Sequence, residues 1–93
     1  MGKSEDPFQG LYEKLSAAND WPKVYMFKFI SPADNHIIAQ VQGMFDAEQA
    51  QISMRQSKKG NYVSITVKEM MMGPERVIDK YRLAAKIPGL MAL

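Results

Sequence analysis

One segment constrains the fold of this chain more than any other: a polar turn that leads into a run of alternating polar and aliphatic residues, SKKGNYVSITV at positions 57–67. Val63, Ile65 and Val67 alternate there with hydroxyl and aromatic side chains. Successive side chains of a β-strand point to opposite faces of the sheet, so this period of two predicts a strand with one buried and one wet face. The buried face needs a second layer to cover it.

The segment before the turn alternates in the same way. Ile52 and Met54 are the apolar members of the run at positions 51–57. In the connection between the two runs, Gly60 or Asn61 can adopt a positive φ. The sequence therefore predicts a β-hairpin whose two strands share one apolar face.

Three segments carry helix signals, and each begins at a proline, Pro7, Pro32 or Pro74, which suits the first helical position. Asp6 and Ser31 precede two of these prolines and are good N-cap residues. Apolar residues then recur at helical spacing. The three stripes are Phe8, Leu11, Tyr12 and Leu15; Ile37, Ile38, Val41, Met44 and Phe45; and Val77, Ile78, Tyr81, Ala84 and Ala85.

Two further strands complete the expected elements. After the Trp-Pro pair at positions 21–22, Tyr25, Phe27 and Phe29 occupy alternate positions. This thick aromatic face places the strand in the middle of the sheet, and its mixed other face suggests partial cover there too. The last four residues, 90–93, are long enough for one short strand.

The order of elements is a helix followed by β-α-β-β-α-β. Two helices on one face of a four-stranded antiparallel sheet form the ferredoxin-like α+β sandwich, with the expected strand order 4-1-3-2. Positions 1–6 are expected to form a flexible tail and 7–93 a single domain. The helix at 7–18 is an addition to this fold, and the sequence leaves open whether it docks on its own domain or on another molecule.

Composition excludes several kinds of site. The chain has no cysteine, which removes disulfides, iron–sulfur clusters and cysteine nucleophiles and favours a cytoplasmic location. His36 is the one histidine and falls outside the apolar stripe of its helix, so we expect a solvated side chain and no metal site. A net charge of +2 does not indicate nucleic acid, and no apolar run approaches the ~20 residues of a membrane span. We expect no cofactor, and we expect Met70, Met71 and Met72 to fill the core.

Three stretches together carry a resemblance to a known family. They are WPKVYMFKFI at 21–30, SKKGNY at 57–62 with SIT at 64–66, and IPGL at 87–90. The chain resembles the YbeD-like family of small uncharacterised bacterial proteins over about residues 21–93. The resemblance implies a ferredoxin-like fold similar to the small-molecule-sensing ACT regulatory domains, and it brings no catalytic residues.

Two other functions of this fold can be weighed from the residues. KGNYV at 59–63 begins like the third-strand motif of RNA-recognition domains, but only Tyr62 could stack on a base there, so RNA binding is kept as the alternative. VQGMF at 41–45 is similar to the phosphate loop of acylphosphatases, but Asp46 follows where that chemistry needs a cation. The sequence has no evident nucleophile–base pair, and we expect that the protein is not an enzyme.

The remaining prediction is a non-catalytic regulatory or binding module. Three cations and several polar groups should share the wet face of the sheet, and the candidate binding residues are Lys28, Arg55, Lys68, Ser64, Thr66 and Tyr62. The hairpin turn adds Lys58, Lys59, Gly60 and Asn61, where two lysines beside a glycine could hold a phosphate. Such a surface could bind a small anionic metabolite or an acidic protein, although ordinary solvation of a wet sheet face explains the same residues more simply. A homodimer is also open, while nucleic acid is disfavoured and no membrane is expected.

Overall fold

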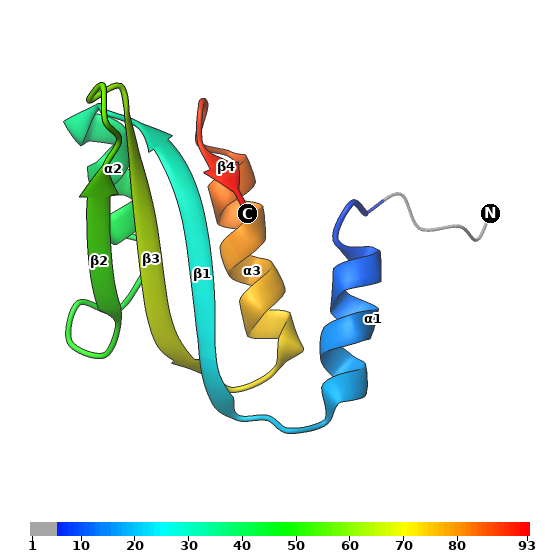
Figure 1. Ribbon diagram of the computed structural model, residues 1–93. Coiled ribbons are helices and arrows are strands. Elements are labelled where there is room, and N and C mark those ends of the chain that lie inside the picture. The colour runs from blue at the N-terminus through cyan, green and yellow to red at the C-terminus, as the bar shows by residue number, and fades with distance from the viewer. Residues whose placement is uncertain (1–5) are drawn as a thin grey trace.

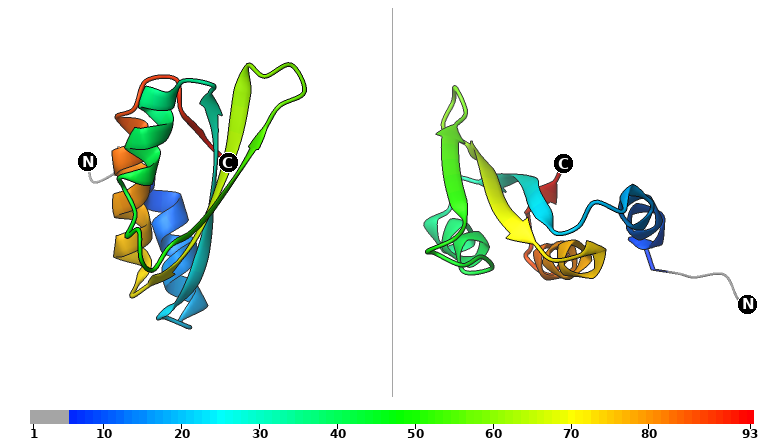
Figure 2. Two further views of the ribbon diagram at one scale, coloured as in Figure 1. Left: turned by 90° about the vertical axis from the view of Figure 1, so that its left-hand side faces the viewer. Right: turned by 90° about the horizontal axis from the view of Figure 1, so that it is seen from below.

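The computed structural model describes residues 6–93, and four of its elements are strands of a single antiparallel sheet in the order β2-β3-β1-β4 (Figure 1). The elements are α1 (Gln9–Ala18), β1 (Lys23–Pro32), α2 (Asn35–Gln42), β2 (Gln51–Gln56), β3 (Tyr62–Met71), α3 (Pro74–Ala85) and β4 (Met91–Ala92). The strand order is the predicted 4-1-3-2 counted from the other edge, which confirms the ferredoxin-like α+β fold. α2 and α3 lie on one side of the sheet, and α1 lies beside α3, beyond the edge of β1 (Figure 2). The predicted tail at 1–6 lies outside the described residues except for Asp6.

The parity of the sheet follows the prediction. β1 and β3 pair along their full lengths, with Phe27 opposite Val67 and Phe29 opposite Ile65. These four side chains are completely buried on the helix side, whereas Tyr62 is exposed. Because a shift of one residue would turn every side chain of a strand to the other face, the register confirms which residues face the helices.

The centre of the core is aromatic. The Phe27 ring lies 5.2 Å from that of Phe45 and 5.4 Å from that of Tyr81, between centroids. Such pairs add about 0.5–1.5 kcal/mol each to the roughly 1.5–3 kcal/mol gained by burying a large apolar side chain. Burial, and a hydrogen bond of 3.2 Å between the hydroxyls of Tyr81 and Tyr25, raise the pKa of Tyr81 above its ordinary value. The tyrosine therefore stays protonated and α3 stays fixed to β1.

The second helix begins later than the sequence signals predict. Ser31 is a buried residue of β1 opposite Val63, and Pro32 still pairs with β3. The N-cap of α2 is Asp34, whose carboxylate accepts the N–H of His36 at 2.8 Å. The local capping signal at Ser31 was wrong because pairing with the long strand β3 keeps this segment extended.

The prediction that Met70, Met71 and Met72 all fill the core is wrong for two of them. β3 continues to Met71, so the period of two runs through the methionine cluster. Met71 faces the helices and is 4% exposed, but Met70 and Met72 are 49% and 66% exposed and do not fill the core. Met54 lies opposite Ile65 on the helix side, but it is half exposed because β2 is an edge strand.

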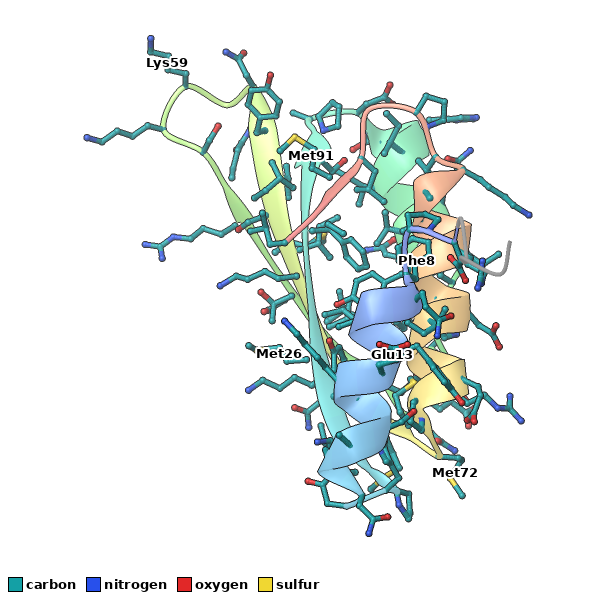
Figure 3. The ribbon with its side chains drawn as sticks, turned by 90° about the vertical axis from the view of Figure 1, so that its right-hand side faces the viewer. Phe8, Glu13, Met26, Lys59, Met72 and Met91 are labelled. Carbon is teal, nitrogen blue, oxygen red and sulfur yellow. The ribbon has the colours of Figure 1, made fainter. Side chains whose placement is uncertain are left out.

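The N-terminal helix docks on α3 of its own chain, which the sequence had left open. It begins at Gln9, slightly later than predicted. Phe8, at the start of α1 in Figure 3, stacks on Tyr81 with the ring centroids 6.2 Å apart. The Arg82 guanidinium lies 5.7 Å from the centre of the Phe8 ring and pairs with the carboxylate of Asp6. Further along the helix, Leu11 and Leu15 pack against the core and the Tyr12 hydroxyl donates to the Glu75 carboxylate at 3.4 Å, so α1 is held along its length.

Candidate functional site

The face of the sheet away from the helices, called the open face below, carries the residues that the sequence analysis placed there. By register its side chains are Val24, Met26, Lys28 and Ile30 on β1; Gln51, Ser53 and Arg55 on β2; Tyr62, Ser64, Thr66, Lys68 and Met70 on β3; and Met91 on β4. Figure 3 shows Met26 and Met91 on the side of the sheet opposite the helices. No aspartate or glutamate belongs to this set of described residues. The open face therefore combines apolar and cationic side chains without an acidic side chain among its described residues.

Two of the predicted cations lie together. Lys28 is opposite Thr66 on β3, and Arg55 is opposite Ser64. Both cations border one hollow of about 410 Å³, which the hydroxyl side chains of β2 and β3 also line. Within residues 6–93, no ion pair involves Lys28, Arg55 or Lys68. Their charges are therefore available to a partner.

Other predicted residues are more scattered. Lys68 borders a separate hollow of about 130 Å³ nearer the start of β2. Lys58 shares a hollow of about 410 Å³ with Arg55 and Tyr62, whereas Lys59 points away from the tip of the hairpin turn (Figure 3). The cations are thus spread along the open face instead of converging on one point, as a small anion would require.

The hairpin turn uses its own backbone groups. Gly60 has a φ of +76°, as predicted, and its N–H donates to the carbonyl of Ser57 at 3.0 Å. The N–H of Tyr62 donates to the Ser57 hydroxyl at 3.1 Å, and the Asn61 carbonyl accepts the N–H of Ala33 at 2.9 Å. Because the Gly60 and Tyr62 amides already have partners, two fewer N–H groups are available for the phosphate cradle predicted for the turn.

Sequence reasoning missed the apolar half of the open face. Val24 and Met26 are 57% and 53% exposed, so the partial cover expected over this side of β1 is wrong. Met70, Met91 and Leu93 are large apolar residues that are also exposed. The signal was present in the sequence, since apolar residues occupy both parities of β1, but only the structure shows that no layer covers the second set.

A buried carboxyl group was also missed. Glu69 is 7% exposed on the helix side of β3, and its Oε2 accepts the N–H of Asp46 at 3.2 Å. Its Oε1 has no hydrogen-bond partner among the described residues. Nearby, the ammonium group of Lys80 donates to the carbonyl of Met44 and lies 5.0 Å from the centre of the Phe45 ring. Glu69 and Lys80 therefore hold the loop between α2 and β2 against the body.

The alternation that places Val67 on the buried face also places Glu69 there. Its burial was missed because the predicted strand was not extended past Lys68. A cavity of about 390 Å³ borders Glu69 between the end of β3 and α3. Its lining mixes methionines with charged side chains of α3. The contacts of Glu69 are those of a residue that positions a loop.

Metal-binding clusters and membrane-spanning helices are both absent from the described part of the chain. Among residues 6–93, no group of three or more histidine, aspartate or glutamate side chains is arranged to hold a metal ion. None of the helices in this range has the length and apolar character needed to cross a membrane. His36 is exposed on α2, where the helical stripe placed it.

Comparison with known proteins gives one match. The family model described as a protein of unknown function (DUF493) matches residues 16–93, from the last turn of α1 onward. Neither a curated protein nor a solved structure matches the chain.

Proposed function

Because the chain belongs to the DUF493 family of proteins of unknown function, membership brings no activity, and we propose that the protein is a non-catalytic binding module whose open face docks an acidic protein partner. The observation that carries the proposal is the pairing of exposed apolar residues with unpaired cations on a face without acids. We also assign the chain to the YbeD-like proteins, with an ACT-like regulatory role. That assignment rests on the sequence resemblance.

The apolar residues favour a protein over a small metabolite. A small anion would use the cations and leave Val24, Met26 and Met91 exposed to water, which costs free energy in proportion to their apolar area. Contiguous apolar surface rimmed by polar groups is typical of protein interaction sites. A partner that covers both the apolar and the cationic parts of the open face uses all of its features.

The charges favour an acidic partner over a second copy stacked face to face. Such stacking would bring Lys28, Arg55 and Lys68 of one copy against the same cations of the other, and like charges across an interface disfavour association. Acidic residues on a different protein would instead pair with them, speed the encounter and make it sensitive to salt. RNA remains the alternative, but Tyr62 is the single aromatic residue that the described strands place on the open face.

The test is capture of a partner by a charge-reversed variant. The tagged protein and its Lys28→Glu/Arg55→Glu variant are purified from their own cells at several salt concentrations, and the co-purifying molecules are identified by mass spectrometry. We expect an acidic protein with the wild type at low salt, and its loss with the variant. Lys14→Glu/Lys86→Glu changes the net charge by the same amount at exposed sites on α1 and after α3, so this control should retain the partner.

The outcomes separate the alternatives. Capture that is unchanged in the variant across the salt series would remove the open face as the binding surface. Recovery of RNA in place of a protein would support the alternative. The melting temperature should be nearly unchanged in both variants, because exposed charges contribute little to folding.

A further inference from the structure

One edge of the sheet is only partly covered. β1 has ten residues and pairs along all of them with β3, but on its other side β4 pairs only with Phe29 and Ile30. Figure 1 shows β4 beside the upper part of β1 and no strand beside the lower part. Between Lys23 and Phe27, no described strand is paired with this edge.

Hydrogen-bond alternation identifies the free backbone groups. The N–H of Leu93 donates to the carbonyl of Lys28 at 2.9 Å, so the backbone groups of Lys28 point toward β4. In an antiparallel ladder, successive residues direct their N–H and C=O groups to opposite sides. The groups of Met26 and Val24 therefore point to the same edge as those of Lys28, and none of the described residues is bonded to them.

The side chains of these two residues are also exposed. Val24 and Met26 lie on the open face and are more than half exposed, so the free backbone groups adjoin apolar surface. The opposite edge of the sheet is different, because β2 presents Gln51, Ser53 and Arg55 on that face. Proteins usually protect an edge strand with charged residues, proline or a cover. Here α1 lies beyond the lower part of β1 (Figure 1), but Val24 and Met26 stay more than half exposed, and no described residue bonds their backbone groups.

We propose that the edge of β1 between Lys23 and Phe27 binds an extended segment of the acidic partner as an additional strand, an inference that rests on the proposed function and specifies its binding mode. Backbone bonds to Val24 and Met26 hold the segment, as in other cases of strand addition. Its apolar side chains on the open face cover those two residues. Acidic side chains at its ends reach the unpaired Lys28 and Lys68, which stand beside and opposite Met26.

Charge complementarity selects a partner segment over a second copy of the chain. Joining this edge to the same edge of a second copy would extend the open face without adding an acid to it, since the described strands carry none on that side. The cations would then remain unpaired. An acidic segment about five residues long, roughly 17 Å in extended form, spans the free edge and neutralises them.

The first experiment measures amide hydrogen exchange by NMR with a capped peptide, ETVTVTE, as the probe. In the free protein, the amides of Val24 and Met26 should exchange much faster than those of Tyr25 and Phe27. The peptide should slow the exchange of Val24 and Met26 at least about tenfold. The same peptide N-methylated at both valines lacks the donors for the edge and should bind at least about tenfold more weakly.

The second experiment compares two substitutions at one position. Val24→Pro removes an N–H that points away from β3, so the β1–β3 ladder stays intact, while Val24→Ala keeps the N–H and shortens the side chain. Strand addition predicts that proline weakens binding of the peptide more than alanine does. Equal losses, or a greater loss with alanine, would overturn it. The N-methylated peptide tests the same bond with wild-type protein, so the test holds even if Val24→Pro does not fold.

The remaining outcomes are distinct from those of the proposed function. Binding of the peptide without protection of Val24 and Met26 would overturn strand addition and leave docking on the open face intact. Absence of peptide binding at millimolar concentration would also overturn strand addition, while partner capture by the Lys28→Glu/Arg55→Glu variant decides the proposed function separately. Protection without peptide, together with a doubled mass in solution, would show that the edge pairs with a second copy and would overturn the proposal.

Discussion

Replacement of Glu69 by methionine should make the protein more stable. The change removes a hydrogen bond to the N–H of Asp46, worth about 0.5–3 kcal/mol. It also removes the Oε1 atom, which is buried without a partner among the described residues at a cost of about 1–3 kcal/mol. The S–CH3 end of a methionine adds about 1 kcal/mol of apolar burial, because the β and γ methylene groups are already present in the buried Glu69 side chain. Asp46 is exposed, so water can bond its N–H after the change.

The sum favours Glu69→Met by about 1–2 kcal/mol in the free energy of unfolding, or roughly 4–15 °C in melting temperature for a domain of this size. Urea unfolding followed by the fluorescence of Trp21, the one tryptophan, measures it. Glu69→Gln is the matched control, because it keeps an acceptor for Asp46 and should change the free energy by less than about 1 kcal/mol. A loss above about 1 kcal/mol in the methionine variant would refute the reasoning and indicate that Oε1 has a partner in solution.

Three further predictions concern stability and the docking of α1. Replacement of the exposed His36 by alanine should change the free energy of unfolding by less than about 0.5 kcal/mol, measured by urea unfolding. Phe27→Ala should cost about 3–5 kcal/mol in the same assay, since the ring is completely buried among aromatic neighbours. The Phe8 amide and the Arg82 guanidinium hold the pKa of Asp6 below its ordinary value, so its contribution to docking is full above about pH 4 and is lost as the pH falls through the lowered pKa. The indole N–H of Trp21 donates to the Leu15 carbonyl of α1 at 2.9 Å, so loosening of α1 changes the surroundings of this tryptophan. Trp21 fluorescence should therefore change on acidification in the wild type and change less in Asp6→Asn.

The sequence determined the parity of the sheet because a period of two is a direct consequence of strand geometry. Val63, Ile65 and Val67 were assigned to the correct face from spacing alone, and the strand order followed from the order of elements. The start of α2 was wrong because a capping signal is local, whereas Ser31 is kept extended by its partner Val63 on β3. Pairing between distant segments overrides such signals, and it is not written in the sequence near either residue.

The candidate site was predictable in its cations but not in its apolar half. Lys28 and Arg55 were placed on the open face by parity, which the register confirms. Whether Met26 on the same face is exposed depends on the presence of a second layer, and alternation says nothing about that. The free edge of β1 depends on the shortness of β4, which pairs at only two positions before Leu93. These are properties of how the elements are assembled, so they required the structure.

A change confined to the apolar half should separate binding from folding. In Met26→Thr the β-branched residue keeps a high strand preference, and because Met26 is about half exposed, the cost should stay below roughly 1.5 kcal/mol. If the open face binds a partner through apolar contact, capture should fall about tenfold while Lys28 and Arg55 still provide attraction. Ser53→Thr, on the polar half of the same face, is the matched control and should leave capture unchanged. A Met26→Thr variant that captures the partner as well as the wild type does would show that the Met26 side chain takes no part in recognition. The apolar docking would then lose its main support, whereas the backbone bonds of strand addition would still be decided by the N-methylated peptide.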